Sequence, residues 1–281
     1  EMRVLNAAPC GPDVQPAQAQ QQQPQQQPHA QVGPAKPAST RRFDAGREAV
    51  SRIFEYVVPS AALVALPRRV LEGGMPAMAE HLRSFRLSPK SEQHLNALLA
   101  LFQTGGTKGI PWNRASWDFA LFTEHPADPL PPNGKPKPST RRSVKQFRCG
   151  ERLMLGGVEH VALRVEGNSF VPCQVRKMVG LLLLLAQATS PRPAEEVVLG
   201  ALQCEGGVHV PLAPAHPLLL DRIVYGVGEK AASPPRDGWS DSYSVQQMEA
   251  FKRSVLYPHI ASPAALHAFA TWLLEAVPSW H

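Results

Sequence analysis

The alternation of apolar and polar residues predicts a small set of β-strands. Between Val158 and Glu166, the apolar residues Val161, Leu163 and Val165 recur at every second position, which is typical of a half-buried strand. Similar runs, rich in β-branched and aromatic residues, predict three further strands. They are Ala49 to Val58, stopped by Pro59, Ser143 to Cys149, and Leu218 to Tyr225. The second of these forms a predicted hairpin with Val158 to Glu166 around Gly150 to Gly157.

Apolar residues at helical spacing predict the remaining elements. Phe170, Val175, Met178, Val179 and Leu181 to Leu185 indicate a helix that is apolar nearly all round and therefore buried. Three amphipathic or capped segments predict other helices. They are Ser91 to Gln103 with Ser91 as N-cap and Gly105 closing it, Pro193 to Leu202, and Ser262-Pro263 through Glu275 with Leu266, Phe269, Trp272 and Leu273 on its apolar face. The sum is an α+β fold, with an antiparallel or mixed sheet and flanking helices.

Two stretches break this pattern. Residues 13–41 are rich in Gln, Pro and Ala and include the run QAQQQQPQQQP, so we expect a disordered insertion that buries too little apolar surface to offset its ordering entropy. Residues 125–140, HPADPLPPNGKPKPST, predict a loop.

Composition narrows the class of protein. Of 281 residues, 43% are hydrophobic and 19% are charged, which are globular values. The net charge of +6 favours an anionic partner, commonly a nucleic acid. The four cysteines are far apart and have no metal-ligand spacing, which argues against a metal site. The longest apolar run, Val179 to Ala186, is too short to cross a bilayer, so no membrane association is expected.

Arg176 is the residue whose placement most needs an explanation. It stands at the entry to the apolar helix, and a guanidinium there needs a carboxylate, a phosphate or water. An alternative interpretation is that its side chain reaches the surface and has no special role.

A series of motifs resembles the TruA family of tRNA pseudouridine synthases. The main one is the family's G-x-S-F-x-x-x-Q-[IV]-R-K-M-V-G pattern, which stands here from Gly167 to Gly180. Other segments resemble the family in the same order, and the last is similar to the tail of the eukaryotic tRNA pseudouridine synthase A branch. They are Glu1 to Leu5, Phe43 to Tyr56, Arg141 to Phe147, Val210 to Tyr225 and Phe251 to Ile260. The resemblance leaves out residues 11–40 and about 61–111.

The resemblance implies a TruA-like catalytic domain that converts uridine to pseudouridine in RNA without a cofactor, and the expected RNA partner is tRNA. Arg176 would pair with a nucleophilic aspartate. Substrate contacts would come from Phe54, where the family has a tyrosine, and from Tyr56, Gln174 and Leu220. RNA phosphates would be bound by Arg47, Arg141, Arg142, Lys145 and Lys177, with Arg41, Arg42, Lys135 and Lys137 as further candidates. By resemblance to eukaryotic members, a monomer is favoured; the compartment (nucleus, mitochondrion or plastid) is left open.

The sequence also departs from the family. No aspartate stands in the family's G-R-T-D-x-G-V-H-A loop, so we expect the nucleophile to lie upstream of Glu1 and the chain alone to be inactive. Gly46, Phe54 and Cys173 replace a basic residue, a tyrosine and a histidine. The predicted organisation is a remnant of the N-terminal half at 1–12, the insertion at 13–41, the C-terminal half of the catalytic domain at 42–232, and a helical extension at 233–281. The alternatives are an inactive RNA-binding relative that serves in assembly and, third, an unrelated basic α+β protein.

Overall fold

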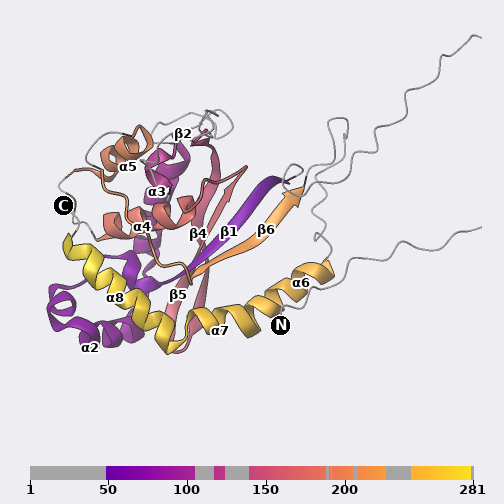
Figure 1. The fold of residues 1–281 in the computed structure, drawn as a ribbon. Helices are drawn as coiled ribbons and strands as arrows, with labels where there is room; N and C mark the ends of the chain where they lie inside the picture. The colour runs from indigo at the N-terminus through magenta and orange to yellow at the C-terminus, as the bar shows by residue number, and fades with distance from the viewer. Residues whose placement is uncertain are drawn as a thin grey trace, which may run out of the picture. The chain divides into compact units, whose positions relative to one another are not determined.

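The sheet has four antiparallel strands, in a computed structural model that describes residues 49–104, 117–123, 139–187, 190, 192–204, 208–225 and 242–279. The strands are β1 (Ala49–Pro59), β4 (Val144–Leu155), β5 (Val158–Gly167) and β6 (Leu218–Tyr225), in the order β4-β5-β1-β6 (Figure 1). Strands β2 (Trp117–Asp118) and β3 (Arg141–Arg142) form a separate pair. All four predicted strands are therefore confirmed. The predicted insertion and most of the predicted loop lie outside the described residues.

The hairpin between β4 and β5 is tighter than predicted. Its turn is the pair Gly156–Gly157, both with positive φ (56° and 79°), which glycine adopts without steric cost. The strand continues through Gly150, where an added Cβ would lie 2.6 Å from the Ala162 carbonyl oxygen. The prediction that Gly150 begins the turn was wrong, because this glycine permits a close approach of two strands.

Within the described ranges, the helices are α2 to α8 and the short helical segments are η1, η2 and η3. Their bounds are η1 (Ser60–Leu63), α2 (Arg68–Ser84), α3 (Pro89–Thr104), η2 (Ala120–Phe122), α4 (Gln174–Ala186), α5 (Ala194–Leu202), α6 (Ser242–Phe251), η3 (Lys252–Leu256), α7 (Tyr257–Ile260) and α8 (Pro263–Ser279). Helix α2 was not predicted. Helix α3 begins at Pro89, earlier than expected. Its capping side chain is Ser88 and not Ser91, because the Ser88 Oγ accepts a hydrogen bond from the Ser91 amide at 3.1 Å.

The C-terminal helix α8 follows its predicted start. The Ser262 Oγ accepts a hydrogen bond from the Ala265 amide at 3.3 Å, and Phe269 and Leu273 are buried, as the apolar spacing indicates. The helix continues past Glu275 to Ser279 with Pro278 inside its last turn.

The two faces of the sheet carry different layers. Tyr56, Val161 and Leu163 belong to the main core, which also contains the buried residues of α3, α4 and α5. Val57 and Ala162, which point the other way, pack against Tyr257 and Ile260 of α7. Side chains of β1 therefore alternate between the α4 face and the α7 face of the sheet.

Among the described residues, no single helix has both the length and the apolar character needed to span a membrane. The bent pair Val245–Ile260 and Pro263–Pro278, with 58° between its parts, meets both conditions only when the two helices are taken together.

Candidate active site

Arg176 is held at the first turn of α4 by a loop that follows α5. Its Nε donates a hydrogen bond to the Ala213 carbonyl oxygen at 2.7 Å, and the Ala213 amide donates to the Arg176 carbonyl at 3.4 Å. Arg176 itself is only half-buried. Among the residues that the structure describes, the two terminal nitrogens of its guanidinium have no hydrogen-bond partner. The side chain is thus fixed through Nε alone.

Gly180 allows this loop to lie directly on α4. A Cβ at position 180 would overlap the Pro211 carbonyl oxygen and lie 3.0 Å from the Pro211 carbonyl carbon and 3.2 Å from the Ala213 amide nitrogen. Only glycine leaves room for the backbone here. The motif glycine and the motif arginine therefore serve the same contact, one helical turn apart.

Tyr56 lies beneath the same loop. Its side chain is fully buried, and its hydroxyl donates a hydrogen bond to the Pro214 carbonyl oxygen at 2.9 Å. Burial raises the pKa of this phenol well above its usual value, and the positive charge of Arg176 opposes that rise. Two successive loop carbonyls, those of Ala213 and Pro214, therefore bind the two predicted site residues Arg176 and Tyr56.

Phe54 lies two residues earlier on β1 and faces the same side of the sheet as Tyr56. Its ring meets Phe170 edge to face, with centroids 5.3 Å apart and planes at 90°. Leu220 of β6 is its direct cross-strand partner and is 48% exposed. Phe54 thus joins Phe170 and Leu220 in one apolar group on the face of the sheet that also carries Tyr56. Phe170 was recognised as part of the motif but not as a site residue.

Two predicted contacts are turned into the protein. The Gln174 side chain is fully buried, and its Oε1 accepts a hydrogen bond from the Val171 amide at 2.9 Å, which closes the start of α4. The Lys177 ammonium donates to the Leu121 carbonyl oxygen at 3.0 Å, and burial lowers its pKa. Their roles toward substrate and RNA stay predictions, but in this structure both polar groups are engaged internally.

The other predicted basic residues lie on β3 and the start of β4. Arg141 is exposed, Arg142 donates to the carbonyl oxygens of Ser139 and Arg141, and Lys145 lies 3.6 Å from Glu166. Arg47 lies outside the described residues, as do the further candidates Arg41, Arg42, Lys135 and Lys137.

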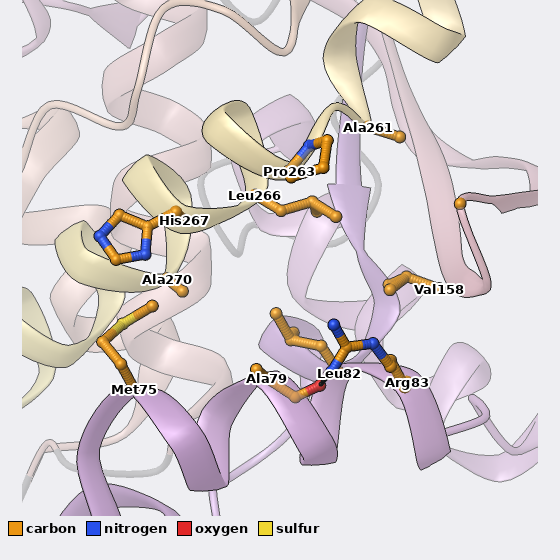
Figure 2. A pocket seen from close by; sticks show the side chains of 11 residues that line it. Met75, Ala79, Leu82, Arg83, Val158, Ala261, Pro263, Leu266, His267 and Ala270 are labelled. Atoms are coloured by element: carbon orange, nitrogen blue, oxygen red, sulfur yellow. Dashed lines mark hydrogen bonds between the residues drawn. The ribbon is translucent and has the colours of Figure 1, made fainter.

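A cavity of about 310 Å³ lies elsewhere, between α2, α8 and the β4–β5 turn. Figure 2 shows apolar side chains of both helices facing it, including Met75, Leu82 and Leu266, with Arg83 and His267 at its margins. None of the predicted site residues lines it. The predicted arginine site therefore does not coincide with this cavity.

The sequence interpretation missed a group of buried charges behind the site. Lys252, Glu55 and Asp221 meet on the α7 face of the sheet, where all three side chains are less than a tenth exposed. Alternation along β1 could have indicated that Glu55 points inward between Phe54 and Tyr56. Nothing in the sequence indicated its partners, because they stand 166 and 197 residues away.

Comparison with known proteins agrees with the motif series. Residues 131–226 match the profile of a family described as tRNA pseudouridine synthase. The predicted resemblance to the TruA family is confirmed. The match includes β4, β5, Arg176 and Leu220 of this TruA-like chain, while β1 lies outside it. The fold prediction, an antiparallel sheet with flanking helices, is confirmed as well.

The TruA-like chain is also similar to curated proteins. It is 28% identical over 240 residues to the pseudouridylate synthase 1 homolog of Mus musculus and 26% identical to that of Homo sapiens, with 83% of this chain and 48% of each relative covered. Over 140 residues it is 29% identical to tRNA pseudouridine synthase 1 of Yarrowia lipolytica, covering 47% of this chain and 25% of that relative. The chain spans about half the length of the mouse and human relatives.

Proposed function

We propose that this chain forms the arginine-bearing part of a tRNA pseudouridine synthase, an isomerase that converts uridine to pseudouridine. One observation carries the proposal. The guanidinium of Arg176 is bound through Nε to the Ala213 carbonyl, while its two terminal nitrogens have no partner among the described residues. Arginine binds a carboxylate with two parallel hydrogen bonds, so this free end is suited to orient a nucleophilic aspartate.

The aspartate would come from polypeptide that is not among these 281 residues. In the proposed reaction it helps to detach the uracil from its ribose, and the base turns and rejoins through carbon. No cofactor is required. The base must first leave its stack, at a cost of a few kcal/mol. Phe54 would provide a ring face for it and Leu220 an apolar wall, since the two are cross-strand neighbours.

Binding of the RNA backbone would fall to the basic side chains that remain on the surface. Arg141 is the clearest, because it is exposed on β3, and Arg142 and Lys145 are partly exposed beside it. Phosphate contacts of this kind weaken as salt is raised. We therefore expect the 281-residue chain to bind tRNA in a salt-dependent way, which a filter-binding titration at two salt concentrations measures.

A second candidate is an RNA-binding relative that has lost catalysis. The observation that favours it is that Phe54 and Cys173 stand where the family has a tyrosine and a histidine. In this case the product of the complete transcript would bind tRNA with the same salt dependence and form no pseudouridine.

The deciding experiment uses the product of the complete transcript and tRNA carrying [5-³H]uridine, from which pseudouridine formation releases tritium. We expect turnover by the wild type and a loss of roughly 10- to 100-fold for Arg176→Lys, because a hydrogen bond to a charged group contributes about 1.5–3 kcal/mol. Arg192→Lys, at an exposed position before α5, is the matched control and should be unchanged. Turnover of Arg176→Lys within twofold of the wild type would contradict the assignment.

A further inference from the structure

The two buried carboxylates behind the candidate site belong to strands β1 and β6, which also carry Phe54 and Leu220. Glu55 stands between Phe54 and Tyr56 on β1, and Asp221 follows Leu220 on β6. Alternate side chains of a strand point to opposite faces. Phe54 and Leu220 thus lie on the α4 face, while the carboxylates of Glu55 and Asp221 meet Lys252 on the α7 face.

Lys252 connects the two strands directly. Its ammonium lies 2.7 Å from Asp221 Oδ1 and 3.2 Å from both Glu55 oxygens, and Glu249 lies 2.7 Å away at the rim. Arg164 approaches Glu55 and Asp221 at 3.8 Å and 3.5 Å from the neighbouring strand β5. The Tyr257 hydroxyl donates to Glu55 at 3.1 Å. Each buried carboxylate thus faces two cations, which is what buried charges require.

The contact falls where the backbone of β6 is irregular. Ile53 pairs with Arg222 while Phe54 pairs with Leu220, so Asp221 is the extra residue of a β-bulge. A bulge bends its strand and changes the direction in which the neighbouring side chains point. Lys252 binds the carboxylate of this extra residue, directly beside Leu220, the cross-strand partner of Phe54.

The helical run that carries Lys252 is irregular as well. The run from α6 to α7 contains the π-helical stretch η3, which begins at Lys252 itself. π-Helical stretches are rare in proteins, and those that occur often lie at functional sites. Here the wider turn begins at the residue whose side chain reaches the sheet, so both backbone irregularities meet at one ion pair.

We propose that Lys252 is a positioning residue for the candidate site: through Glu55 and Asp221 it sets the separation and register of β1 and β6, and thereby the placement of Phe54 and Leu220 against the substrate base. The inference rests on the proposed function for its meaning, but not for its geometry. It gives η3 and α7 a part in the reaction, although Tyr257 and Ile260 of α7 pack on the opposite face of the sheet.

The geometric test uses the 281-residue chain with 4-fluorophenylalanine at position 54 and records its ¹⁹F spectrum. Lys252→Met should shift or broaden the resonance, because two buried carboxylates then face Arg164 alone. Arg253→Met, which removes the neighbouring ion pair with Glu151 on the surface, should leave the resonance unchanged. If Lys252→Met does not fold, the charge-balanced double variant Glu55→Gln/Lys252→Met takes its place. A wild-type resonance in a folded variant, with only the melting temperature lowered, would overturn the proposal.

The catalytic test uses the same variants in the product of the complete transcript. Lys252→Met should lower kcat by about tenfold or more, since misplacement by about 1 Å lowers rates up to 10²-fold, while the KM for tRNA changes less than twofold. Lys252→Arg, which keeps the charge, should recover part of kcat. A changed ¹⁹F resonance together with an inactive wild type contradicts the proposed function and leaves the positioning role supported. An active wild type whose Lys252→Met variant keeps a normal kcat refutes the positioning role alone.

Discussion

Replacing Gly180 by alanine tests whether the loop on α4 holds Arg176 in place. The new Cβ would overlap the Pro211 carbonyl oxygen, which must retreat by about 1 Å or more to regain an ordinary contact distance of about 3.5 Å. The Ala213 carbonyl, two residues further on, accepts the Arg176 Nε at 2.7 Å. A displacement of that size carries the acceptor beyond hydrogen-bond distance.

The expected magnitude follows from three terms. Overpacking costs about 1–3 kcal/mol and the lost hydrogen bond about 0.5–1.5 kcal/mol, while alanine in a helix gains up to about 1 kcal/mol over glycine. We therefore expect Gly180→Ala to lower the free energy of unfolding by about 1–3 kcal/mol. In the complete protein it should also reduce tritium release, because Arg176 loses its support.

Urea unfolding followed by circular dichroism measures the first effect. Ala268→Gly, at an exposed position in α8, measures the difference in helix propensity between alanine and glycine without a change in packing. If Gly180→Ala instead raised the free energy of unfolding by about 1 kcal/mol, propensity alone would explain it. In that case the loop does not rest on Gly180 and the account of the Arg176 tether fails.

Two further predictions concern stability. His160 is fully buried with a pKa lowered by burial, against a hydrogen bond to the Val158 carbonyl. The folded state therefore disfavours protonation of His160. The stability that the neutral side chain supports should be lost as the pH falls below the pKa of histidine in the unfolded chain, about 6.5. The difference between wild type and His160→Gln in melting temperature, measured from pH 8 to 5, should shrink on acidification; because the pKa values of His81 and His216 are lowered too, only that difference is diagnostic, and a constant difference would contradict the prediction. Separately, Gly157→Ala should cost about 1–2 kcal/mol in urea unfolding, because φ is +79° in the β4–β5 turn, whereas a neutral result would show that the turn relaxes freely.

Local patterns predicted the elements whose stabilising contacts are local or one-sided. The strands were identified from period-two alternation, and α8 was identified from Ser262 and its apolar face. Helix α2 was missed because Gly73, Gly74 and Pro76 are helix breakers, and the structure indeed places a non-helical residue at Gly74 (φ 61°). The helix forms nevertheless, because Val70, Met78 and Leu82 are buried in the main core.

Side-chain motifs identified Arg176 and Tyr56 but could not identify the acceptors of their hydrogen bonds. The carbonyls of Ala213 and Pro214 carry no signal in the sequence, because every residue has a carbonyl and only the fold selects which ones face inward. The same limit explains why the internal hydrogen bonds of Gln174 and Lys177 were not predicted. Both follow the motif pattern of a contact residue, but α4 is enclosed on nearly all sides, so their polar groups bind the Val171 amide and the Leu121 carbonyl.

The geometry of Arg176 favours the proposed pairing with a carboxylate over the alternative that its side chain merely reaches the surface. A side chain that merely reaches solvent has no need of a fixed acceptor, yet Nε is bound at 2.7 Å by a loop that a motif glycine admits. With Nε occupied, an incoming carboxylate must approach the two terminal nitrogens, end on and in the guanidinium plane. Lysine has one ammonium and cannot be tethered at one atom while presenting a planar pair at another. Arg176→Lys keeps the positive charge but should still lose turnover by roughly 10- to 100-fold. Its activity therefore distinguishes an oriented guanidinium from a simple positive charge.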